Sequence, residues 1–293
     1  MCTCPAWATA CAPPDPAAAL QPSLSFCTFA MRNTMPFTLY TFAMSHYSEK
    51  IRWTLDTAGV PYQESVMTPV FHMLPALRMG RRGQTTLPVL EGRGQRVQDS
   101  PRILDWLNRE GLLSDLIPNA HVAEVRAIED RFNRIGKDVA RLLYARSFGK
   151  ADEHIVRLWV EHASPLQAAV IKAFYPVIRW GFRRKLNITE AAARRAEQRI
   201  GQEVAWLESR LTDGRTYLVG EQLTVADITA ASLLAPIACP TEHPVYGDSA
   251  FREAMTEATA PWRHSAAMAW VRAMYQHRRG AMQGGVNLMR QAA

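Results

Sequence analysis

The stretch YLVGEQLTVADI at residues 217–228 carries the clearest local signal in this 293-residue chain. Thr224 and Asp227 have the spacing of a capping box in its Asp form, in which each side chain bonds the other residue's backbone N–H at a helix N-terminus. Leu223 and Ile228 stand where a hydrophobic staple places its two apolar residues. The stretch therefore predicts a helix that begins directly after Thr224.

Helical periodicity extends to both sides of this box. After a polar turn near residues 118–119, apolar residues recur at helical spacing almost throughout. The predicted helices cover residues 122–146, 152–184, 190–211, 225–234 and 262–278. We therefore expect an all-helical domain over residues 121–280, joined to the preceding part of the chain by a linker at residues 112–120.

Residues 36–111 have a different pattern, in which short extended runs alternate with helices. The predicted elements are a strand from residue 37, a helix at residues 46–58, an extended run at residues 60–66, strands at residues 86–90 and 96–98, and a helix at residues 101–109. This order of strand, helix, strand, hairpin and helix predicts an α/β domain.

Three motifs in this α/β segment carry polar or backbone chemistry. SHYSEKIR at residues 45–52 opens the first helix, TLPVL at residues 86–90 places a proline at a strand start, and DSP at residues 99–101 opens the last helix. Together with residues 217–228, these motifs resemble the glutathione transferase superfamily, in its zeta-like and omega-like branches. The resemblance covers residues 36–278. It implies an α/β thioredoxin-like N-terminal domain over residues 36–111, followed by an all-α C-terminal helical domain.

The resemblance gives the catalytic role to Ser45, which lies seven residues before Arg52, the spacing of the catalytic serine or cysteine in those branches. A thiol with a pKa of about 8.5 is mostly protonated at neutral pH, and its thiolate is the nucleophile. A hydrogen bond from the Ser45 hydroxyl and the positive end of the helix dipole would both favour the thiolate of bound glutathione. Taken alone, Ser45 is more simply interpreted as a helix cap. Tyr40, at the end of the first strand, is a second candidate hydroxyl.

The resemblance also implies four glutathione-binding residues. Pro88 would be a cis-proline, which turns the N–H and C=O of Leu87 outward to pair with the peptide backbone of glutathione. Asp99 would meet the ammonium group, and Ser100, as the cap of a helix with Pro101 in its first turn, would face the γ-glutamyl carboxylate. A trans-proline on an edge strand and an ordinary capped helix are the structural alternatives.

The loop at residues 79–85 departs from the family pattern. The residue that meets the glycine carboxylate of glutathione is therefore not assigned by the resemblance. Gln84 and Arg82 are candidates, and a solvated loop charge is the default interpretation of both.

Composition excludes several classes of protein and site. The formal net charge is +7, but Lys and Arg are scattered among acids and no nucleic-acid-binding motif accompanies them, so we expect no nucleic acid partner. Four of the five cysteines lie in the first 27 residues, and no Cys/His pair at zinc-site spacing follows, so we expect no metal. Because only Cys239 lies in the predicted folded part, we expect a cytoplasmic protein without a disulfide scaffold.

Both ends of the chain differ from its centre. Residues 1–35 are rich in Ala and Pro and almost uncharged, which predicts a disordered extension. Arg32 is the only basic residue there, which argues against a targeting segment, and translation from Met31 or Met35 is an alternative. We expect a flexible tail at residues 281–293.

Residues 165–185 are apolar and aromatic, and they end in the basic run at residues 183–185. Lys172, Pro176 and Arg179 interrupt the apolar residues, so the segment does not predict a membrane span. A helix that lies on a membrane is one alternative. We favour a kinked core helix, and we expect no membrane association.

These features predict a cytoplasmic, detoxifying glutathione transferase in which Ser45 stabilises the thiolate of glutathione, the co-substrate, for attack on an apolar electrophile. The helical domain would bind that electrophile, with Tyr144, Phe148, Trp159 and Trp180 as aromatic candidates that core packing would equally explain. The family implies a homodimer. A glutathione-dependent isomerase or dehalogenase, or a non-catalytic ligand-binding protein, would use the same fold.

Overall fold

The computed structural model of the chain describes residues 37–80 and 83–280. The expected disordered extension at residues 1–35 and the expected tail at residues 281–293 lie outside the described residues.

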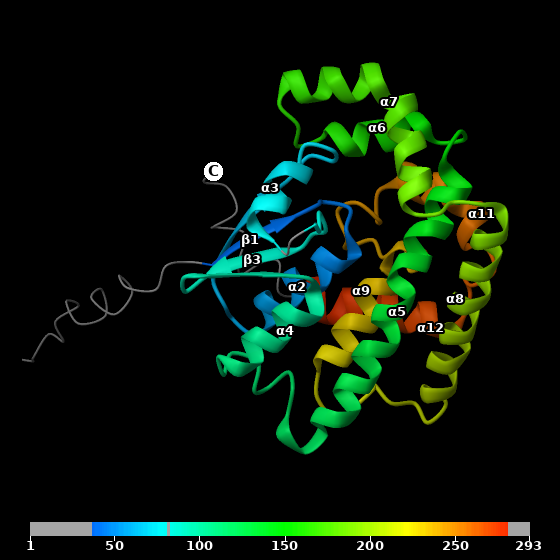
Figure 1. Cartoon of the computed structure of the whole chain (residues 1–293). Coiled ribbons are helices and arrows are strands. Elements are labelled where there is room, and N and C mark those ends of the chain that lie inside the picture. Colours follow the sequence, from blue (N-terminus) through cyan, green and yellow to red (C-terminus); the bar gives the residue numbers. More distant parts are fainter. Residues whose placement is uncertain (1–36, 81–82, 281–293) are drawn as a thin grey trace, which may run out of the picture. The chain divides into compact units, whose positions relative to one another are not determined.

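A mixed four-stranded sheet organises the N-terminal part of the fold (Figure 1). Its strands lie in the order β2-β1-β3-β4, with β1 and β2 parallel and the other neighbours antiparallel. The strands are β1 (Phe37–Thr41), β2 (Tyr62–Val66), β3 (Val89–Gly92) and β4 (Gln95–Gln98). Arg93 and Gly94 join β3 to β4 with positive φ angles of 49° and 72°, the conformation of a two-residue hairpin turn.

Three helices accompany this sheet: α2 (His46–Thr57), α3 (Met73–Met79) and α4 (Ser100–Arg109). Helices α2 and α4 pack against each other, and α4 also contacts β3 and β4. Apolar side chains from the sheet and these helices form the core, in which the Phe37 and Trp106 rings meet edge to face at 5.5 Å. The sequence did not predict α3, which contains Pro75 and buries only Ala76. The sheet and its helices confirm the predicted thioredoxin-like fold.

Helices make up the rest of the described chain. They are the 3-10 turn η1 (Asn119–His121), α5 (Val122–Ser147), α6 (Asp152–Val160), α7 (Pro165–Lys185), α8 (Glu190–Arg210), α9 (Val225–Ala238), α10 (Ser249–Ala254), α11 (Thr256–Thr259), α12 (Ala266–Met274) and the π-helical turn η2 (Tyr275–Arg279). Every residue of α9 is buried, and α9 packs against α2, α5 and α12. Helix α9 therefore joins the helical part to the α/β part, and the predicted all-helical C-terminal architecture is confirmed.

The predicted start of α9 is confirmed. The Thr224 N–H donates to Asp227 Oδ2 over 2.8 Å, and the Leu218 N–H donates to Asp227 Oδ1 over 2.7 Å. The Asp227 carboxylate therefore ties the segment before the helix to its first turn.

The prediction of a single helix over residues 152–184 is wrong, because the chain turns between α6 and α7. Ser164 and Gln167 form a capping box, and Pro165 occupies the first turn of α7. These are strong helix-start signals, and they interrupt the apolar periodicity.

The prediction that residues 165–185 form a core helix is also wrong. Only Ile171 and Tyr175 of α7 are buried. They belong to a separate small cluster under α7 that also contains Phe148, Ile155, Trp159 and Ile188. No described helix is both long and apolar enough to cross a bilayer.

Buried charged groups fix helix α2 against the helical part. Lys50 Nζ lies 2.8 Å from Glu129 Oε1 on α5, and Arg279 Nε in η2 lies 2.8 Å from Glu49 Oε1. All four side chains are almost completely buried. Since a buried charge without a partner is costly, these pairs fix the position of α2 and of the residue at its N-terminus, Ser45.

Candidate functional site

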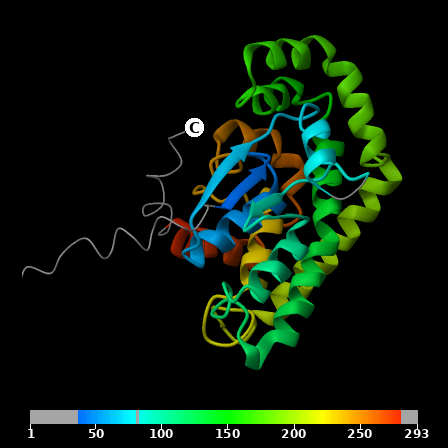
Figure 2. The ribbon, with the colours of Figure 1, turned by 60° about the vertical axis from the view of Figure 1, so that its left-hand side comes forward.

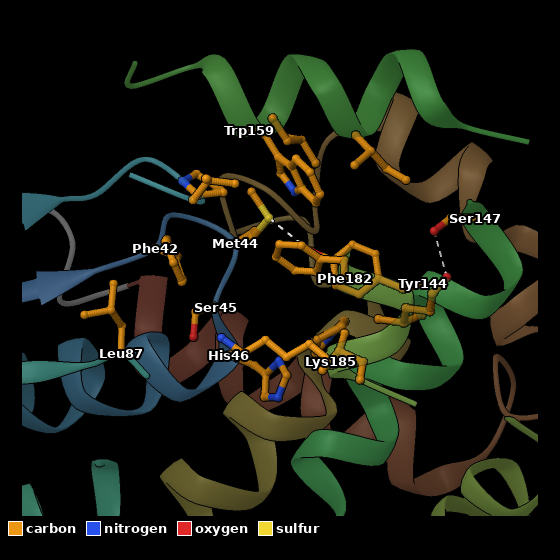
Figure 3. A pocket seen from close by; sticks show the side chains of 18 of the residues that line it. Phe42, Met44, Ser45, His46, Leu87, Tyr144, Ser147, Trp159, Phe182 and Lys185 are labelled. Atoms are coloured by element: carbon orange, nitrogen blue, oxygen red, sulfur yellow. Dashed lines mark hydrogen bonds between the residues drawn. The ribbon is translucent and has the colours of Figure 1, made fainter. Parts of the chain in front are cut away.

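A cavity of about 540 Å³ lies between the N-terminus of α2 and the helices α5, α6 and α7. Figure 3 shows Phe42, Ser45 and Leu87 on one side of it, across from Phe182 and Tyr144. Apolar and aromatic side chains make up most of its wall. A volume and lining of this kind suit a small organic ligand.

Ser45 lies at the N-cap of α2 and lines this cavity. Its Oγ accepts a hydrogen bond from the Ser48 N–H over 3.2 Å, and its backbone is extended, with φ −87° and ψ 115°. Because an accepting hydroxyl keeps its own hydrogen for a second bond, the capping and catalytic interpretations of Ser45 are compatible.

Arg52 holds the loop before Ser45. Its Nη2 donates to the Phe42 carbonyl over 2.8 Å, and its Nε donates to Glu64 Oε1 over 2.5 Å. Buried Arg52 therefore links the loop before α2 to strand β2. This contact gives a structural reason for the spacing between Ser45 and Arg52.

His46 and Tyr47 connect the start of α2 to α5. His46 Nε2 lies 3.0 Å from the Gly136 carbonyl oxygen, and the Tyr47 hydroxyl donates to the Asn133 carbonyl over 3.0 Å. Burial lowers the pKa of His46 to about 4. The imidazole is therefore neutral at pH 7 and acts as a structural link to α5.

Tyr40 lies away from the cavity. Its hydroxyl donates to Glu91 Oε2 on β3 over 3.0 Å, and Tyr40 is not among the residues that line the cavity. The structure therefore does not bring this second candidate hydroxyl to Ser45.

The Leu87–Pro88 peptide bond is cis, as the TLPVL motif suggested. Leu87 lines the cavity together with Thr85 and Thr86, whereas Pro88 does not. The segment directly before the cis bond therefore forms part of the cavity wall.

Asp99 and Ser100 lie next to this part of the wall. The Asp99 N–H donates to the Pro88 carbonyl over 3.2 Å, and the Thr86 hydroxyl donates to Asp99 Oδ1 over 3.0 Å. Neither Asp99 nor Ser100 lines the cavity itself. The hydrogen bonds of Asp99 to Thr86 and Pro88 hold Asp99 and Ser100 next to the cavity wall.

The expectation that Ser100 caps α4 is corrected. Asp99 stands at the cap position with φ 79°, its side chain makes no capping bond, and Ser100 is the first residue of the helix. Ser100 is 2% exposed, and among the described residues its Oγ has no hydrogen-bond partner. A buried hydroxyl without a partner at a helix N-terminus is a group that a bound anion would satisfy.

Lys137 and Lys185 were not found from the sequence. They are the only acidic or basic side chains, histidines aside, among the described residues that line the cavity. Lys185 Nζ lies 3.0 Å from Thr85 Oγ1, and Lys137 follows Gly136, the partner of His46. Gln84 does not line the cavity, and Arg82 lies outside the described residues. The charged part of the wall is therefore basic.

Two of the aromatic candidates, Tyr144 and Trp159, line the cavity, and Phe148 and Trp180 do not. The Tyr144 ring stacks on Phe148 at 4.9 Å, and burial raises the pKa of its phenol. Phe182 from α7 packs beside Trp159 at 4.7 Å. This side of the cavity is therefore an aromatic surface with a phenol that stays protonated.

Comparison with known proteins places this geometry in a family. A model of the glutathione S-transferase N-terminal domain matches residues 39–110, and a model of the glutathione S-transferase C-terminal domain matches residues 190–273. Together the two models match just over half of the chain. A search of curated protein sequences gives no significant match.

Solved structures share the fold at low sequence identity. A glutathione S-transferase of Methylobacterium radiotolerans in complex with glutathione sulfonate is 18% identical, covers 80% of this chain and 93% of its own, and has a TM-score of 0.51. A glutathione S-transferase of Ceriporiopsis subvermispora in complex with glutathione is 15% identical, covers 84% of this chain and 98% of its own, and has a TM-score of 0.54. The β-etherase LigF of Sphingobium is 18% identical, covers 81% of this chain and 98% of its own, and has a TM-score of 0.50. With both domain models matched in order on the expected fold, this chain belongs to the glutathione transferase superfamily.

Proposed function

We propose that this protein binds glutathione and transfers its sulfur to an apolar electrophile, with Ser45 stabilising the thiolate. The main observation in support is the position of Ser45 at the N-terminus of α2. Ser45 lines the same cavity as Leu87, the residue that precedes the cis-proline. Glutathione and glutathione sulfonate in complexes with structurally similar proteins support this choice of ligand.

Ser45 would act on the sulfur through its hydroxyl hydrogen. The N–H groups and dipole of the first turn of α2 add positive potential at the same point. Both favour the thiolate over the thiol, which lowers the thiol pKa and raises the fraction of nucleophile at neutral pH. The thiol proton passes to solvent, the sulfur forms a bond to the electrophilic carbon, and the leaving group departs with its electron pair.

Each polar group of glutathione would meet a protein group of complementary charge or hydrogen-bonding capacity. Leu87 would pair with the peptide backbone through its main chain, and Asp99 would meet the ammonium group. The γ-glutamyl carboxylate would reach the buried Ser100 hydroxyl, which has no partner among the described residues. Lys185 would meet the glycine carboxylate, because it lines the cavity and contacts Thr85, two residues before Leu87.

The electrophile would bind against the aromatic side of the cavity. Tyr144, Trp159 and Phe182 offer ring surfaces there. Apolar burial and ring contacts favour a substrate with an aromatic or other flat apolar group. Holding it beside the sulfur would accelerate the reaction through proximity.

Calorimetric titration of glutathione, combined with thiolate absorbance across a pH series, tests this proposal. Ser45→Ala should raise the thiol pKa of bound glutathione by about 1 unit, since one stabilising hydrogen bond of roughly 1.4 kcal/mol is lost. The affinity of the Ser45→Ala variant for glutathione should change little. Tyr40→Phe should leave both quantities unchanged, because the Tyr40 hydroxyl bonds Glu91.

Ser45→Ala also removes a helix cap, so a matched control is needed. Ser265 caps α12 and accepts from the Met268 N–H over 3.1 Å, away from the cavity wall. Ser265→Ala should cost similar stability, about 1 kcal/mol, with no change in thiol pKa. If wild type does not bind glutathione, the transferase proposal is wrong. If Ser45→Ala leaves the bound thiol pKa unchanged, Ser45 is only a cap.

A further inference from the structure

Against the expectation of no membrane association drawn from the sequence, we propose that the exposed apolar face formed by α3 and α7 docks on an anionic lipid surface. This apolar face consists of the exposed side chains Met73, Leu74 and Leu77 of α3 and Leu166, Phe174, Val177 and Trp180 of α7. Its α7 part lies in residues 111–189, between the two stretches that the family models match. The proposal does not depend on the reaction that the cavity catalyses.

The apolar side chains of this face are large and well exposed. Phe174 is 58% exposed, Val177 65% and Trp180 60%. Because their spacing of three residues is close to one helical turn, these side chains lie on the same side of α7, away from the buried Ile171 and Tyr175. Large apolar side chains exposed together on one side of a helix are typical of an interaction site.

The two helices belong to one face. The Thr68 hydroxyl, in the loop before α3, donates to Gln167 Oε1 in the first turn of α7 over 3.1 Å. Met73 of α3 and Val177 of α7 are both exposed and both line the cavity. Figures 1 and 2 show α3 and the α6–α7 segment next to each other from two directions.

The charge of this face selects its partner. Neither α3 nor α7 contains an acidic residue, whereas α7 carries Lys172, Arg179, Arg183, Arg184 and Lys185. Arg179 is paired with Asp152, and Lys185 contacts Thr85. Lys172, Arg183 and Arg184 are exposed. Arg184 lies on the same side of α7 as Trp180 and would contact the headgroups of anionic lipids, whereas Lys172 and Arg183 would add longer-range attraction.

One basic side chain of α7, Arg184, lies beside an exposed aromatic ring. The Arg184 guanidinium is 5.1 Å from the centre of the Trp180 ring. Basic side chains next to Trp and Phe are typical of helices that lie in the plane of a bilayer surface, where rings enter the acyl boundary and cations meet headgroups. Because no described helix is long and apolar enough to cross a bilayer, the contact would be peripheral.

A second copy of this chain is the main competing occupant. A two-fold symmetric contact through this face would bring the same cationic surface against itself. No acid on α3 or α7 would offset that repulsion. Charge complementarity therefore favours an anionic lipid surface over self-association.

Docking in this orientation would have a direct consequence for the cavity. Because Met73 and Val177 belong to both the face and the cavity wall, the cavity would open next to the lipid. Under the proposed transferase function, an apolar electrophile dissolved in the bilayer would then reach the thiolate without crossing water.

Flotation of the full chain with vesicles tests the docking. The probes are vesicles of phosphatidylcholine alone and vesicles that also contain phosphatidylglycerol. Wild type should float with the phosphatidylglycerol vesicles only, and added salt should release it. The variant Phe174→Glu/Trp180→Glu should bind at least tenfold more weakly; neither residue lines the cavity.

A matched control carries the same kind of change elsewhere. Val122 is 40% exposed at the start of α5, outside the face, and Val122→Glu should float like wild type. Circular dichroism should show that all variants fold. Absence of wild-type binding to phosphatidylglycerol vesicles would overturn the proposal, as would equal loss in Val122→Glu. Loss of a wild-type dimer in Phe174→Glu/Trp180→Glu, without vesicle binding by either, would make the face an interface between copies instead.

Discussion

Lys185 Nζ lies 3.0 Å from Thr85 Oγ1, so the last turn of α7 touches the segment that leads into the cis-proline. Helix α7 therefore brings a cation to the α/β part of the site from the helical part. The two residues are 100 positions apart in the chain.

Lys185→Met should weaken glutathione binding about fivefold, which corresponds to roughly 1 kcal/mol for an exposed ion pair. The reason is the proposed contact with the glycine carboxylate. Calorimetry should show no such effect for the glycine ethyl ester of glutathione, which lacks that charge. Lys172→Met, an exposed lysine on the same helix that does not line the cavity, should leave both affinities unchanged. Equal weakening for the acid and the ester would contradict the assignment.

Ser100→Ala should weaken glutathione binding about tenfold and leave the free energy of unfolding within about 0.5 kcal/mol. The hydroxyl is buried and has no protein partner among the described residues, so its removal breaks no internal bond. A hydrogen bond to the charged γ-glutamyl carboxylate would be lost, roughly 1.5 kcal/mol. The dipeptide Cys-Gly, which lacks the γ-glutamyl group, should bind wild type and variant equally. A large drop in stability with unchanged affinity would instead make Ser100 structural.

The protein should lose stability as the pH falls from 6.5 to 4. Burial lowers the pKa of His46, His72 and His243 from 6.5 to about 4. Within that window the unfolded chain binds more protons than the folded one at these three sites, so unfolding is favoured as acid is added. Asp227 opposes this: burial raises its pKa from 3.8 to about 6, and its contribution to stability is lost as the pH rises through 6.

Three histidines against one aspartate leave a net uptake of about two protons on unfolding near pH 5, or roughly 2–3 kcal/mol per pH unit. Urea unfolding at several pH values measures this slope. His243→Gln should reduce it by about one proton. A free energy of unfolding that is flat between pH 6.5 and 5 would show that the histidines titrate normally in the folded protein.

Asp227→Asn should destabilise the fold by about 2 kcal/mol. Oδ2 of Asp227 accepts from both the N–H and the hydroxyl of Thr224 at 2.8 Å, while Oδ1 accepts from the Leu218 N–H. An amide NH₂ at either oxygen position would face a donor and leave it unsatisfied. Chemical unfolding measures the loss. Asp213→Asn, at an exposed turn, is the control and should cost much less.

Local signals in the sequence were enough for much of the fold. The box at Thr224 and Asp227 marks the start of α9 because all its partners lie within ten residues. The TLPVL motif and the order of helices and strands along the α/β part were likewise predicted from local patterns. The break before α7 was also local, in Ser164 and Pro165, but apolar periodicity on both sides concealed it.

The rest depends on contacts between distant segments. Nothing near Lys185 in the sequence indicates that it meets Thr85, and the basic run at residues 183–185 was considered only as the end of the apolar segment. The exposure of Trp180 depends on how α7 lies over the chain, which periodicity does not determine. Tyr40 remained a candidate until its hydroxyl was placed on Glu91.

The pairing of Glu49 with Arg279 bears on how the protein is made. The arginine follows the glutamate by 230 residues. As the chain leaves the ribosome, the α/β part emerges first, yet helix α2 lacks a main counter-charge for its buried carboxylate until η2 has been translated. The helix that Ser45 caps thus reaches its final electrostatic setting only after η2 has been made, and a fragment ending after α4 lacks this arginine.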